Sequence, residues 1–558
     1  MKMNKDEACG APPHVGAYIT SEEMAALDEN CNFFGLSSLQ LMENAGAEVA
    51  KEVKKRFNGE ERRAKVTILA GKGNNGGDAF AAVRHLQRFN VKILLIGRSH
   101  ELRTEETKRN WRILKESGYA IEEIADSSSL KAAAATFNAS DVIIDAIFGT
   151  GIKGTIREPE ATAIDLINEA KPHAFVVAVD IPSGLDPDTG EAEKAVRADL
   201  TVTFHRAKGG LLRERAAEYV GELVVADIGI PDGLERLAGP GDVRLVMKRD
   251  PSSHKGDNGR VLIVGGGPFF GAPTLAALAA LRAGADWVTI AAPQSVSAII
   301  ASFSPNLIVH PLSSEIMVEK DVPVVLNLIT QHDVVVLGMG LGAAEETKGA
   351  TRLIIEDKAS KKVVVDADGF YGLHLPIQTL RKFDQQTKPL QGLRGQRGGA
   401  PLFRKSLIKN AAHASQEDKL VIVTPHAGEF SKMDIDEGGR ITVPPEERME
   451  ERIDFVSDFS RLNNVVTLLK GPTDIIADGT RVKLNRTGNA GMTVGGTGDV
   501  LAGITGAFFA ISPDPFKAAT AAAFVNGSAG DLALEEKGYG LLATDVIENI
   551  PRVIKDFR

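Results

Sequence analysis

Cysteine and long apolar runs are scarce in this chain of 558 residues. Its two cysteines, Cys9 and Cys31, cannot build a disulfide framework or by themselves a four-ligand zinc site, and so few suit a reducing compartment. The longest largely apolar stretch, 500–511, is too short to span a bilayer, and residues 1–18 lack the apolar core of a secretory signal. We therefore expect a cytoplasmic protein with no membrane partner.

A surplus of positive charge is also missing. Acidic residues number 74 and basic residues 65, which gives a formal net charge of −9. Nothing global therefore draws the chain to nucleic acid, and any anionic ligand must be held by a local site. Hydrophobic residues make up 43% and charged residues 25%, so the chain has the composition of a globular protein with a sizeable core.

The distribution of apolar residues predicts an α/β fold, because apolar runs flanked by glycine turns alternate with segments of helical periodicity. In the first half, a helix is predicted at 77–89 and strands at 66–70, 91–96, 142–145, 175–180 and 200–204. In the second half, the predicted strands are 260–264, 287–291, 334–337, 362–365, 420–423 and 465–469, followed by a hairpin at 474–484.

Between residues 231 and 257 the sequence no longer shows a strand or helix pattern and is rich in proline, glycine and aspartate. We therefore predict two domains, 1–238 and 239–558. A segment rich in Lys, Arg, Gln and Gly, 379–410, interrupts the second domain. Its composition suits either a mobile basic insertion or a lid over a phosphate ligand.

The first half contains a glycine turn between a predicted strand and a predicted helix, Gly71–Asp78. Such a turn leaves backbone N–H groups directed at one spot, and the helix dipole makes that spot attractive to phosphate. A tight structural crossover has the same pattern. The Asn-Asn-Gly-Gly-Asp run within the turn adds amide and carboxylate oxygens that could serve a cation or a ribose.

Two further carboxylates, Asp145 and Asp180, stand at the carboxyl ends of predicted strands, where open α/β sheets bind their ligands. Either one could instead cap a helix or a turn. Three loops that carry Asp or Asn at the same edge of a sheet favour a binding site.

Five segments of the first half carry a resemblance to a known family: Leu41–Gly46, Gly73–Asp78, Asp145–Gly151, Asp180–Gly184 and Thr203–Lys208. In this order they resemble the NAD(P)HX epimerase family over about the first 230 residues. The resemblance implies a Rossmann-like three-layer α/β/α domain.

The epimerase resemblance also implies residue roles. Asp180 would be the catalytic proton shuttle. Asn75, Asp145 and Ser183 would hold a potassium ion, which suits ligands that are all oxygen. The hydrated dinucleotide would contact Asn74, Asn75, Gly76, Gly77, Asp78, Gly149, Thr150, Gly151, Ile152, Lys153, Gly154, Thr155 and Asp180.

The second half contains a longer glycine loop, Asn489–Gly503, in which several glycines precede an apolar helix. Asp499 falls in the first turn of that helix. Backbone N–H groups of the loop would bind a transferring phosphoryl group, and the Asp499 carboxylate would take a proton from an attacking hydroxyl. The alternative is an N-terminal helix residue that is favoured only by the dipole.

The second half resembles the ribokinase-like superfamily, and more narrowly the ADP- or ATP-dependent NAD(P)HX dehydratases, from about residue 245 to the end. The segments that carry this resemblance, besides the glycine loop, are His254–Gly259, Gly338–Gly342, Val365–Gly369, Thr424–Glu429 and Lys470–Asp474.

The dehydratase resemblance implies two groups of ligand contacts and the catalytic residue Asp499. The phosphate donor would contact Lys470, Gly471, Pro472, Thr473, Asp474, Asn489, Ala490, Gly491, Met492, Thr493, Val494, Gly495, Gly496, Thr497 and Gly498. The hydrated nicotinamide would contact Gly340, Thr424, Pro425, His426, Ala427, Gly428, Glu429, Phe430 and Asp499. Taken alone, Lys470 could equally be a solvated strand-end cation and His426 a capped turn residue.

Together the two resemblances imply a bifunctional enzyme, an isomerase joined to a lyase. It would epimerise (R)- and (S)-NAD(P)HX and dehydrate the (S) epimer to NAD(P)H, with K⁺ and Mg²⁺ as cofactors and ADP or ATP as phosphoryl donor. We also expect a homo-oligomer. The alternatives are a ribokinase-like small-molecule kinase, distinguished by a stable phosphorylated product, and a first domain that is a non-catalytic nucleotide- or RNA-binding module.

Overall fold

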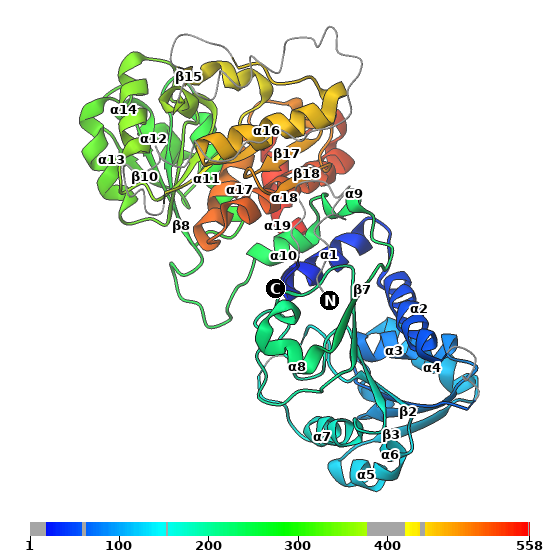
Figure 1. Ribbon diagram of the computed structural model, residues 1–558. Helices are drawn as coiled ribbons and strands as arrows, with labels where there is room; N and C mark the ends of the chain where they lie inside the picture. Colours follow the sequence, from blue (N-terminus) through cyan, green and yellow to red (C-terminus); the bar gives the residue numbers. More distant parts are fainter. Residues whose placement is uncertain are drawn as a thin grey trace, which may run out of the picture. The chain divides into compact units, whose positions relative to one another are not determined.

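The computed structural model describes residues 18–57, 63–151, 154–375, 419–435, 441–555 and 557. The basic segment 379–410 and the predicted contacts Ile152 and Lys153 lie outside these described residues. Contacts divide the chain into two compact units, with the division between Glu235 and Arg236, and Figure 1 labels the elements of both.

The first unit is built on a parallel sheet with the strand order β3-β2-β1-β4-β5-β6-β7. Its strands are β1 (Lys65–Ala70), β2 (Asn90–Ile96), β3 (Ala120–Ile124), β4 (Val142–Ala146), β5 (Phe175–Val179), β6 (Leu200–Phe204) and β7 (Glu222–Ala226). From β1 the chain adds β2 and β3 toward one edge of the sheet, and it then returns to add β4 to β7 toward the other edge. The switch point lies between the neighbouring strands β1 and β4. Ligands of open α/β sheets bind at such a switch point.

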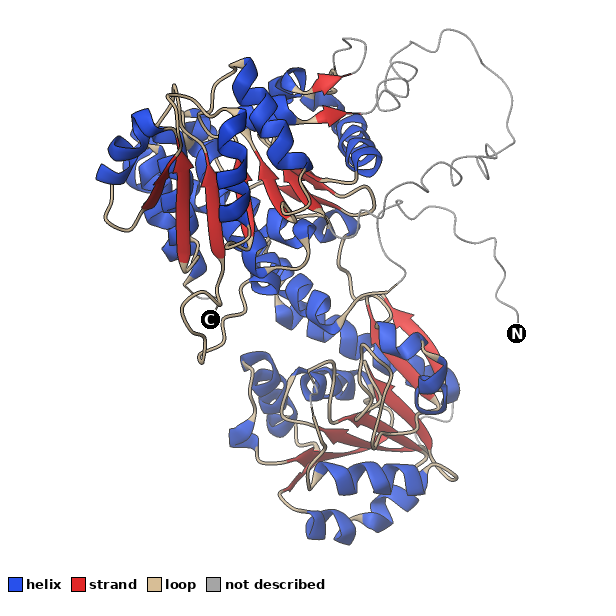
Figure 2. Cartoon of the chain, turned by 90° about the vertical axis from the view of Figure 1, so that its left-hand side faces the viewer, coloured by secondary structure: helices blue, strands red, loops and turns tan. Residues whose placement is uncertain are grey.

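Helices cover both faces of this first sheet, as Figure 2 shows. One face is buried under α1 (Ser21–Phe33), α2 (Ser38–Phe57), α3 (Asn74–His85) and α4 (Glu105–Glu116). The other face is buried under α5 (Ser127–Ala132), α6 (Ala134–Asn138) and α7 (Glu160–Ala170). The short helices α8 (Ala217–Val220) and α9 (Asp232–Glu235) complete the unit. The result is a three-layer α/β/α arrangement.

The second unit has a mixed sheet with the strand order β10-β9-β8-β11-β12-β14-β16-β17-β18, parallel as far as β16 and antiparallel in the last two pairings. Its strands are β8 (Arg260–Val264), β9 (Trp287–Ala292), β10 (Ile308–Pro311), β11 (Val334–Leu337), β12 (Lys362–Val365), β14 (Leu420–Val423), β16 (Val466–Leu469), β17 (Asp474–Ala477) and β18 (Val482–Asn485). A small separate pairing joins β13 (His374–Leu375) to β15 (Asp434–Ile435). The α/β class predicted from the sequence is confirmed.

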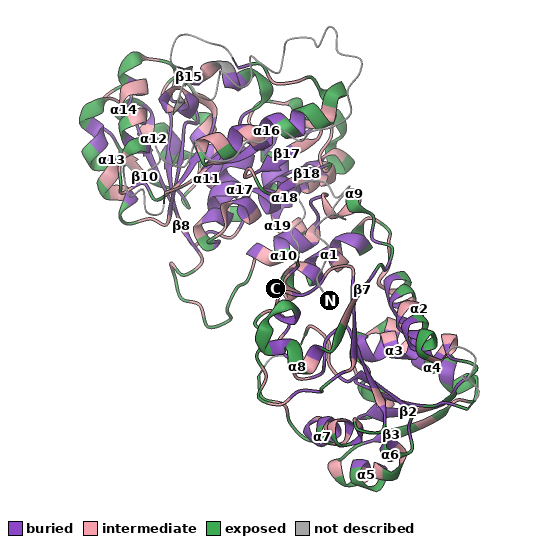
Figure 3. Ribbon diagram, viewed as in Figure 1, coloured by how far each residue is buried: buried purple, intermediate pink, exposed green. Residues whose placement is uncertain are grey.

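A large apolar core lies between this second sheet and four helices, α11 (Gly271–Arg282), α17 (Thr497–Ile511), α18 (Pro515–Lys537) and α19 (Ala543–Ile554). The other helices of the second unit are α10 (Pro240–Val246), α12 (Gln294–Ser302), α13 (Val322–Ile329), α14 (Glu345–Glu356) and α16 (Met449–Asn463). The central strands of both sheets are buried in Figure 3. Because helices cover both faces of these strands, a ligand can reach them only at their ends. The residues of the sites described below lie at the carboxyl ends.

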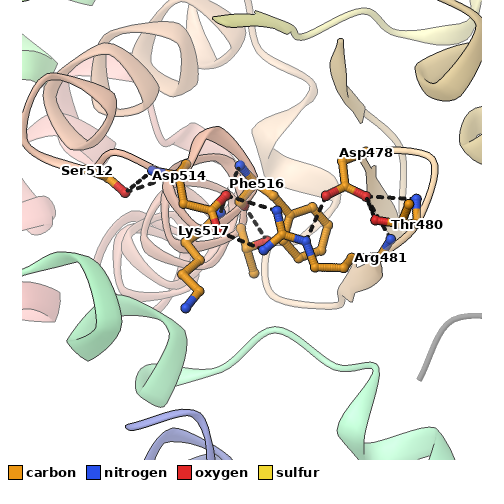
Figure 4. Close-up of polar contacts among 8 residues, drawn as sticks. Asp478, Thr480, Arg481, Ser512, Asp514, Phe516 and Lys517 are labelled. Atoms are coloured by element: carbon orange, nitrogen blue, oxygen red, sulfur yellow. Dashed lines mark hydrogen bonds and ion pairs between the residues drawn. The ribbon is translucent and has the colours of Figure 1, made fainter. Parts of the chain in front are cut away.

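The predicted hairpin is confirmed, and one arginine fixes it to α18 (Figure 4). Arg481 donates from Nε to Asp478 Oδ2 at 2.7 Å and from its terminal nitrogens to both carboxylate oxygens of Asp514, at 2.6 and 3.0 Å. Asp514 also caps the N-terminus of α18, and the guanidinium lies 4.4 Å from the centre of the Phe516 ring. The outer edge of the sheet is therefore held against the core helices.

Of the helices in the described part of the chain, none is both long and apolar enough to cross a membrane.

Candidate active sites

A cleft of about 1060 Å³ lies at the switch point of the first sheet, between the loops that follow β1 and β4. Most of the residues predicted to contact a dinucleotide line it: Asn74, Asn75, Asp78, Gly149, Thr150, Gly151, Gly154, Thr155 and Asp180. The helix α3 begins at Asn74 rather than at the predicted residue 77, so the Asn-Asn-Gly-Gly-Asp run forms its first turn.

Two predicted contacts, Gly76 and Gly77, are packed against protein rather than among the residues that line the cleft. A Cβ atom on Gly76 would lie 2.1 Å from the carbonyl oxygen of Gly71, and one on Gly77 would lie 2.6 Å from Met42 Cε. At Gly76 only glycine permits this close approach, which brings the first turn of α3 against the preceding loop. Gly77 packs instead against the side chain of Met42 on α2.

Asp180 is held in the cleft by a buried lysine that the sequence analysis did not single out. Lys208 Nζ donates to Asp180 Oδ1 at 2.6 Å, and Thr203 Oγ1 donates to the same oxygen at 2.9 Å. The side chains are buried, with Lys208 1% and Asp180 9% exposed. Asp180 also has a left-handed backbone, with φ of 63°, a conformation that aspartate tolerates better than most residues. Its carboxylate is therefore fixed in one position.

Asp28 and Asp78 join Asp180 around the same lysine. Burial raises the pKa of Asp28 to about 6; Lys208 and His205 oppose this effect and the charge of Asp180 adds to it. Burial also raises the pKa of Asp78 well above its usual range, and the charges of Asp180 and Asp28 add to the effect. The cleft thus contains carboxyl groups that can hold or release a proton near neutral pH.

Asn75, Asp145 and Ser183, predicted to share a cation, lie together beside the cleft. Ser183 donates to Asp145 from its backbone nitrogen at 2.8 Å and from Oγ at 2.6 Å, while Asn75 Nδ2 donates to the carbonyl oxygen of Phe148 at 2.8 Å. Burial raises the pKa of Asp145 to about 6, although the hydrogen bonds from Ser183 oppose the shift. The buried oxygen Asn75 Oδ1 has no hydrogen-bond partner among the described residues.

The second site lies at the carboxyl ends of β12, β14 and β16. Lys470, directly after β16, donates to Asp366 Oδ1 at 2.8 Å and lies 3.4 Å from Glu429 Oε2. Thr424 Oγ1 donates to the same Asp366 oxygen at 2.8 Å. Burial tends to lower the pKa of Lys470, but Asp366 and Glu429 outweigh it and raise that pKa. Lys470 is therefore a half-buried cation that is paired with two carboxylates, and not a solvated one.

Asp499 is the third residue of α17 and faces this cluster. Burial raises its pKa to about 7; the charge of Asp366 adds to the rise, and Lys470 opposes it. Glu429 and Asp368 contribute smaller repulsions of the same sign as Asp366. A carboxyl group with this pKa is suited to accept a proton near neutral pH.

The N-terminus of α17 offers backbone donors to an anion. No side chain of the described residues caps it, and Gly496, with φ of 100°, turns the chain into the helix. A Cβ atom on Gly498 would lie 3.4 Å from Lys470 Nζ, so the ammonium group adjoins this end of the helix. Unpaired N–H groups, the helix dipole and a lysine together form a site for phosphate.

Other predicted contacts with the phosphate donor have structural partners of their own. Asn489 donates to Asp531 and accepts from Gly491, and Thr497 Oγ1 donates to the carbonyl oxygen of Met492. Burial raises the pKa of Asp474 to about 6, and its carboxylate accepts from Gly471 and Asn485. Gly471, Pro472, Thr473, Ala490, Gly491, Thr493, Val494 and Gly495 lie in the β16–β17 turn or in the loop that leads into α17.

The residues of the loop after β14 differ in how they take part in the second site. Glu429 is buried beside Lys470, and the exposed ring of His426 accepts a hydrogen bond from the Gly428 backbone. Pro425 and Ala427 provide backbone on either side of His426. Phe430 is 0% exposed, and its ring packs edge-on against Phe455 and Phe459. The Phe430 side chain therefore belongs to the core and leaves only its backbone to the loop.

Gly340 lies at the turn after β11, where its φ is 72°. A Cβ atom at this position would lie 2.0 Å from the carbonyl oxygen of Phe269. The turn after β8 can approach the turn after β11 only because this residue is glycine.

These two sites, each at the carboxyl edge of a predominantly parallel sheet, define a two-domain α/β enzyme. Residues 38–210 match a family model described as YjeF-related protein N-terminus, and residues 261–388 and 405–552 match one described as NAD(P)H-hydrate dehydratase.

Relatives resemble the chain over nearly its whole length. It is 44% identical to the bifunctional NAD(P)H-hydrate repair enzyme Nnr of Archaeoglobus fulgidus, and the aligned region covers 96% of this chain and 98% of the relative. It is 42% identical to the enzyme of the same name from Pyrobaculum aerophilum, covering 97% and 98%. The chain belongs to the family of bifunctional NAD(P)H-hydrate repair enzymes. The family resemblance read from its motifs is confirmed.

Among solved structures, the chain is similar to an ADP/ATP-dependent NAD(P)H-hydrate dehydratase from Bacillus subtilis that was co-crystallised with ATP and Mg²⁺. That likeness has 24% identity and a TM-score of 0.42, and it covers 58% of this chain and 98% of the other.

Proposed function

We propose that the chain repairs hydrated NADH and NADPH with two activities. The first domain interconverts the (R) and (S) epimers, and the second dehydrates the (S) epimer with ADP or ATP as phosphoryl donor. Full-length similarity to bifunctional repair enzymes supports this proposal. The structural observation that carries it is the position of Asp499, which stands beside Lys470 at the uncapped N-terminus of α17.

The second site suits transfer of a phosphoryl group to the hydroxyl of the hydrated ring. Backbone N–H groups of α17 and the Lys470 ammonium hold the donor phosphates, and Asp499 removes the proton from the attacking hydroxyl. Hydroxide is a poor leaving group, whereas phosphate is a good one. Once the hydroxyl is phosphorylated, the lone pair of the ring nitrogen expels phosphate and restores the dihydropyridine.

Asp366 and Glu429 have a supporting role in this step. Both are paired with Lys470 and fix its ammonium at the end of α17. Their negative charges also raise the proton affinity of Asp499. The same cluster thus positions the phosphate-binding cation and strengthens the base.

The first site suits inversion at ring carbon 6. Inversion requires the hydroxyl to leave as water and water to return on the other face, so protons must be given and taken. Asp180, fixed by Lys208 and Thr203, is the residue we assign to this proton transfer.

Potassium fits the cluster beside the first site, because Asn75 Oδ1 is a buried oxygen that lacks a partner within the described residues. Asn75, Asp145 and Ser183 would hold the ion. Its positive charge would offset the buried carboxylate of Asp145 and fix the loop that carries Gly149.

Magnesium has no protein cage here, since the described residues contain no group of three or more His, Cys, Asp or Glu side chains able to hold a metal. Asp366 and Glu429 are already engaged by Lys470. We propose that Mg²⁺ enters bound to the donor phosphates. Cytoplasmic location and assembly into a homo-oligomer stay predictions.

Recovery of reduced-nicotinamide absorbance tests the proposed function. Purified protein is mixed with both epimers of hydrated NADH, K⁺, Mg²⁺ and either ADP or ATP. We expect full recovery of NADH with at least one donor. Recovery that stops when one epimer is consumed would contradict the epimerase, and accumulation of a stable phosphorylated alcohol would favour a small-molecule kinase.

A further inference from the structure

The first cleft holds more ionisable groups than one proton shuttle requires. Asp28 on α1 and Asp78 on α3 line the same cavity as Asp180 and Lys208. The Lys208 ammonium interacts electrostatically with Asp28 and Asp78 and is hydrogen-bonded to Asp180. The Asp28 carboxyl group accepts no hydrogen bond from any described residue. It is therefore available to a bound ligand.

The chemistry of inversion explains why a second group is needed. On one face of the ring, the hydroxyl gains a proton and leaves as water; the C6–O electron pair departs with it, and the ring nitrogen lone pair forms a C=N bond. On the other face, a water oxygen bonds to carbon 6 and gives up a proton, while the electron pair returns to nitrogen. A carboxyl group fixed in one wall of a cleft reaches only one face of a bound ring.

We infer that Asp28 is the second acid–base residue of the epimerase site and transfers the proton on the ring face that Asp180 does not reach. This inference rests on the epimerase function proposed above. The two carboxyl groups enter the cavity from different layers, Asp180 from the end of β5 and Asp28 from the covering helix α1. Lys208 lies near both and offsets the charge of whichever one is ionised.

The charges that face Asp28 are consistent with this role. Lys208 and His205 favour its ionised form, while Asp180 and Asp78 disfavour it. Burial raises the pKa of Asp28 and of Asp78, so both carboxyl groups hold a proton at higher pH than a solvated aspartate does. One turnover moves a proton from one carboxyl group to the other, and exchange with solvent resets the pair.

Oxygen-isotope exchange distinguishes proton transfer on one ring face from proton transfer on the other. Each purified epimer is incubated without nucleotide in water enriched in ¹⁸O, and both inversion and ¹⁸O uptake at carbon 6 are measured by mass spectrometry after chromatography. In Asp28→Asn we expect inversion to fall about 100-fold or more in both directions. One epimer should still exchange oxygen at close to the wild-type rate, because its own face is served by Asp180. In Asp180→Asn, we expect the other epimer to exchange its C6 oxygen at close to the wild-type rate.

Three outcomes would overturn the inference. Asp28→Asn could invert both epimers at the wild-type rate, it could lose both exchange reactions in parallel, or Asp78→Asn could show the split in its place. Glu22→Gln, an exposed carboxyl change on the same helix, is the matched control and should behave as wild type. If the wild-type protein itself inverts neither epimer, the proposed epimerase function fails and not merely the role of Asp28.

Discussion

Lys208 Nζ lies 2.6 Å from Asp180 Oδ1, and the lysine is almost fully buried. Removing the ammonium would leave Asp180 as a buried carboxylate without its counter-charge, which costs about 3–5 kcal/mol in typical proteins. We therefore expect Lys208→Met to destabilise the first domain and to slow epimerisation, while dehydration of the (S) epimer continues.

The chain offers a probe and a control for this measurement. It has two tryptophans, so in a Trp287→Phe background Trp111 alone reports unfolding of the first domain by fluorescence. Lys171→Met removes a half-exposed ammonium from Asp199 and should cost no more than about 1 kcal/mol. Equal losses in the two variants would contradict the buried pair.

The dehydration rate should depend on the ionisation of Asp499. A base must be deprotonated to accept a proton, so with a pKa of about 7 the value of kcat/KM should rise with pH and level off above 7. At pH 6 it should be about tenfold below the plateau. Asp499→Asn should lower dehydration by about 100-fold or more, with nucleotide affinity nearly unchanged. A flat pH profile in the wild-type enzyme would argue against this base.

The same carboxyl group should make the second domain less stable as pH rises. The folded-state pKa of Asp499 lies above its unfolded value, so the folded protein holds this proton longer and stability is lost between about pH 4 and pH 7. Asp499→Asn removes that loss. Its Tm should match the wild type at pH 4 and exceed it at pH 8, measured by Trp287 fluorescence in a Trp111→Phe background. A Tm difference that does not change with pH would contradict the raised pKa.

Epimerisation should require potassium through Asn75. We expect dialysis against tetramethylammonium chloride to reduce inversion and added K⁺ to restore it. Asn75→Ala, which removes the unpaired buried oxygen, should raise the K⁺ concentration needed for half-maximal inversion by about tenfold or more. Asn168→Ala removes an amide that hydrogen-bonds to Ala195 outside the cleft, and should leave that concentration unchanged. An identical K⁺ response in both variants would remove Asn75 from the ion site.

The sequence predicted the central strands well, because a strand covered on both faces must be apolar along its length. β8, β11, β12 and β14 have the predicted bounds. In the two main sheets the strands that escaped prediction are β3, β7 and β10, and each of them is an edge strand. The two-residue strands β13 and β15 were not predicted either. In β3 the exposed Glu122 and Glu123 break any apolar run, so no periodic signal was available.

The site was predictable where local backbone geometry dictates it. Short stretches of neighbouring residues are enough to recognise the glycine turns before α3 and α17 and the aspartates that follow strands. The pairing of Asp366 with Lys470 joins positions 104 residues apart, and no local pattern indicates it. Asp28 was missed for a different reason, since one aspartate in a helix that also carries Glu22 and Glu23 has the signature of a solvated residue.

Complementation between two inactive variants tests the central claim most directly. With a mixture of both epimers of hydrated NADH, K⁺, Mg²⁺ and the nucleotide donor, Asp180→Asn should recover only the (S) share of the NADH, and Asp499→Asn should recover none. Mixing the two variants should restore complete recovery, because each supplies the site that the other lacks. Complete recovery by Asp499→Asn alone, or a mixture that recovers no more than Asp180→Asn, would contradict two separate active sites in this chain.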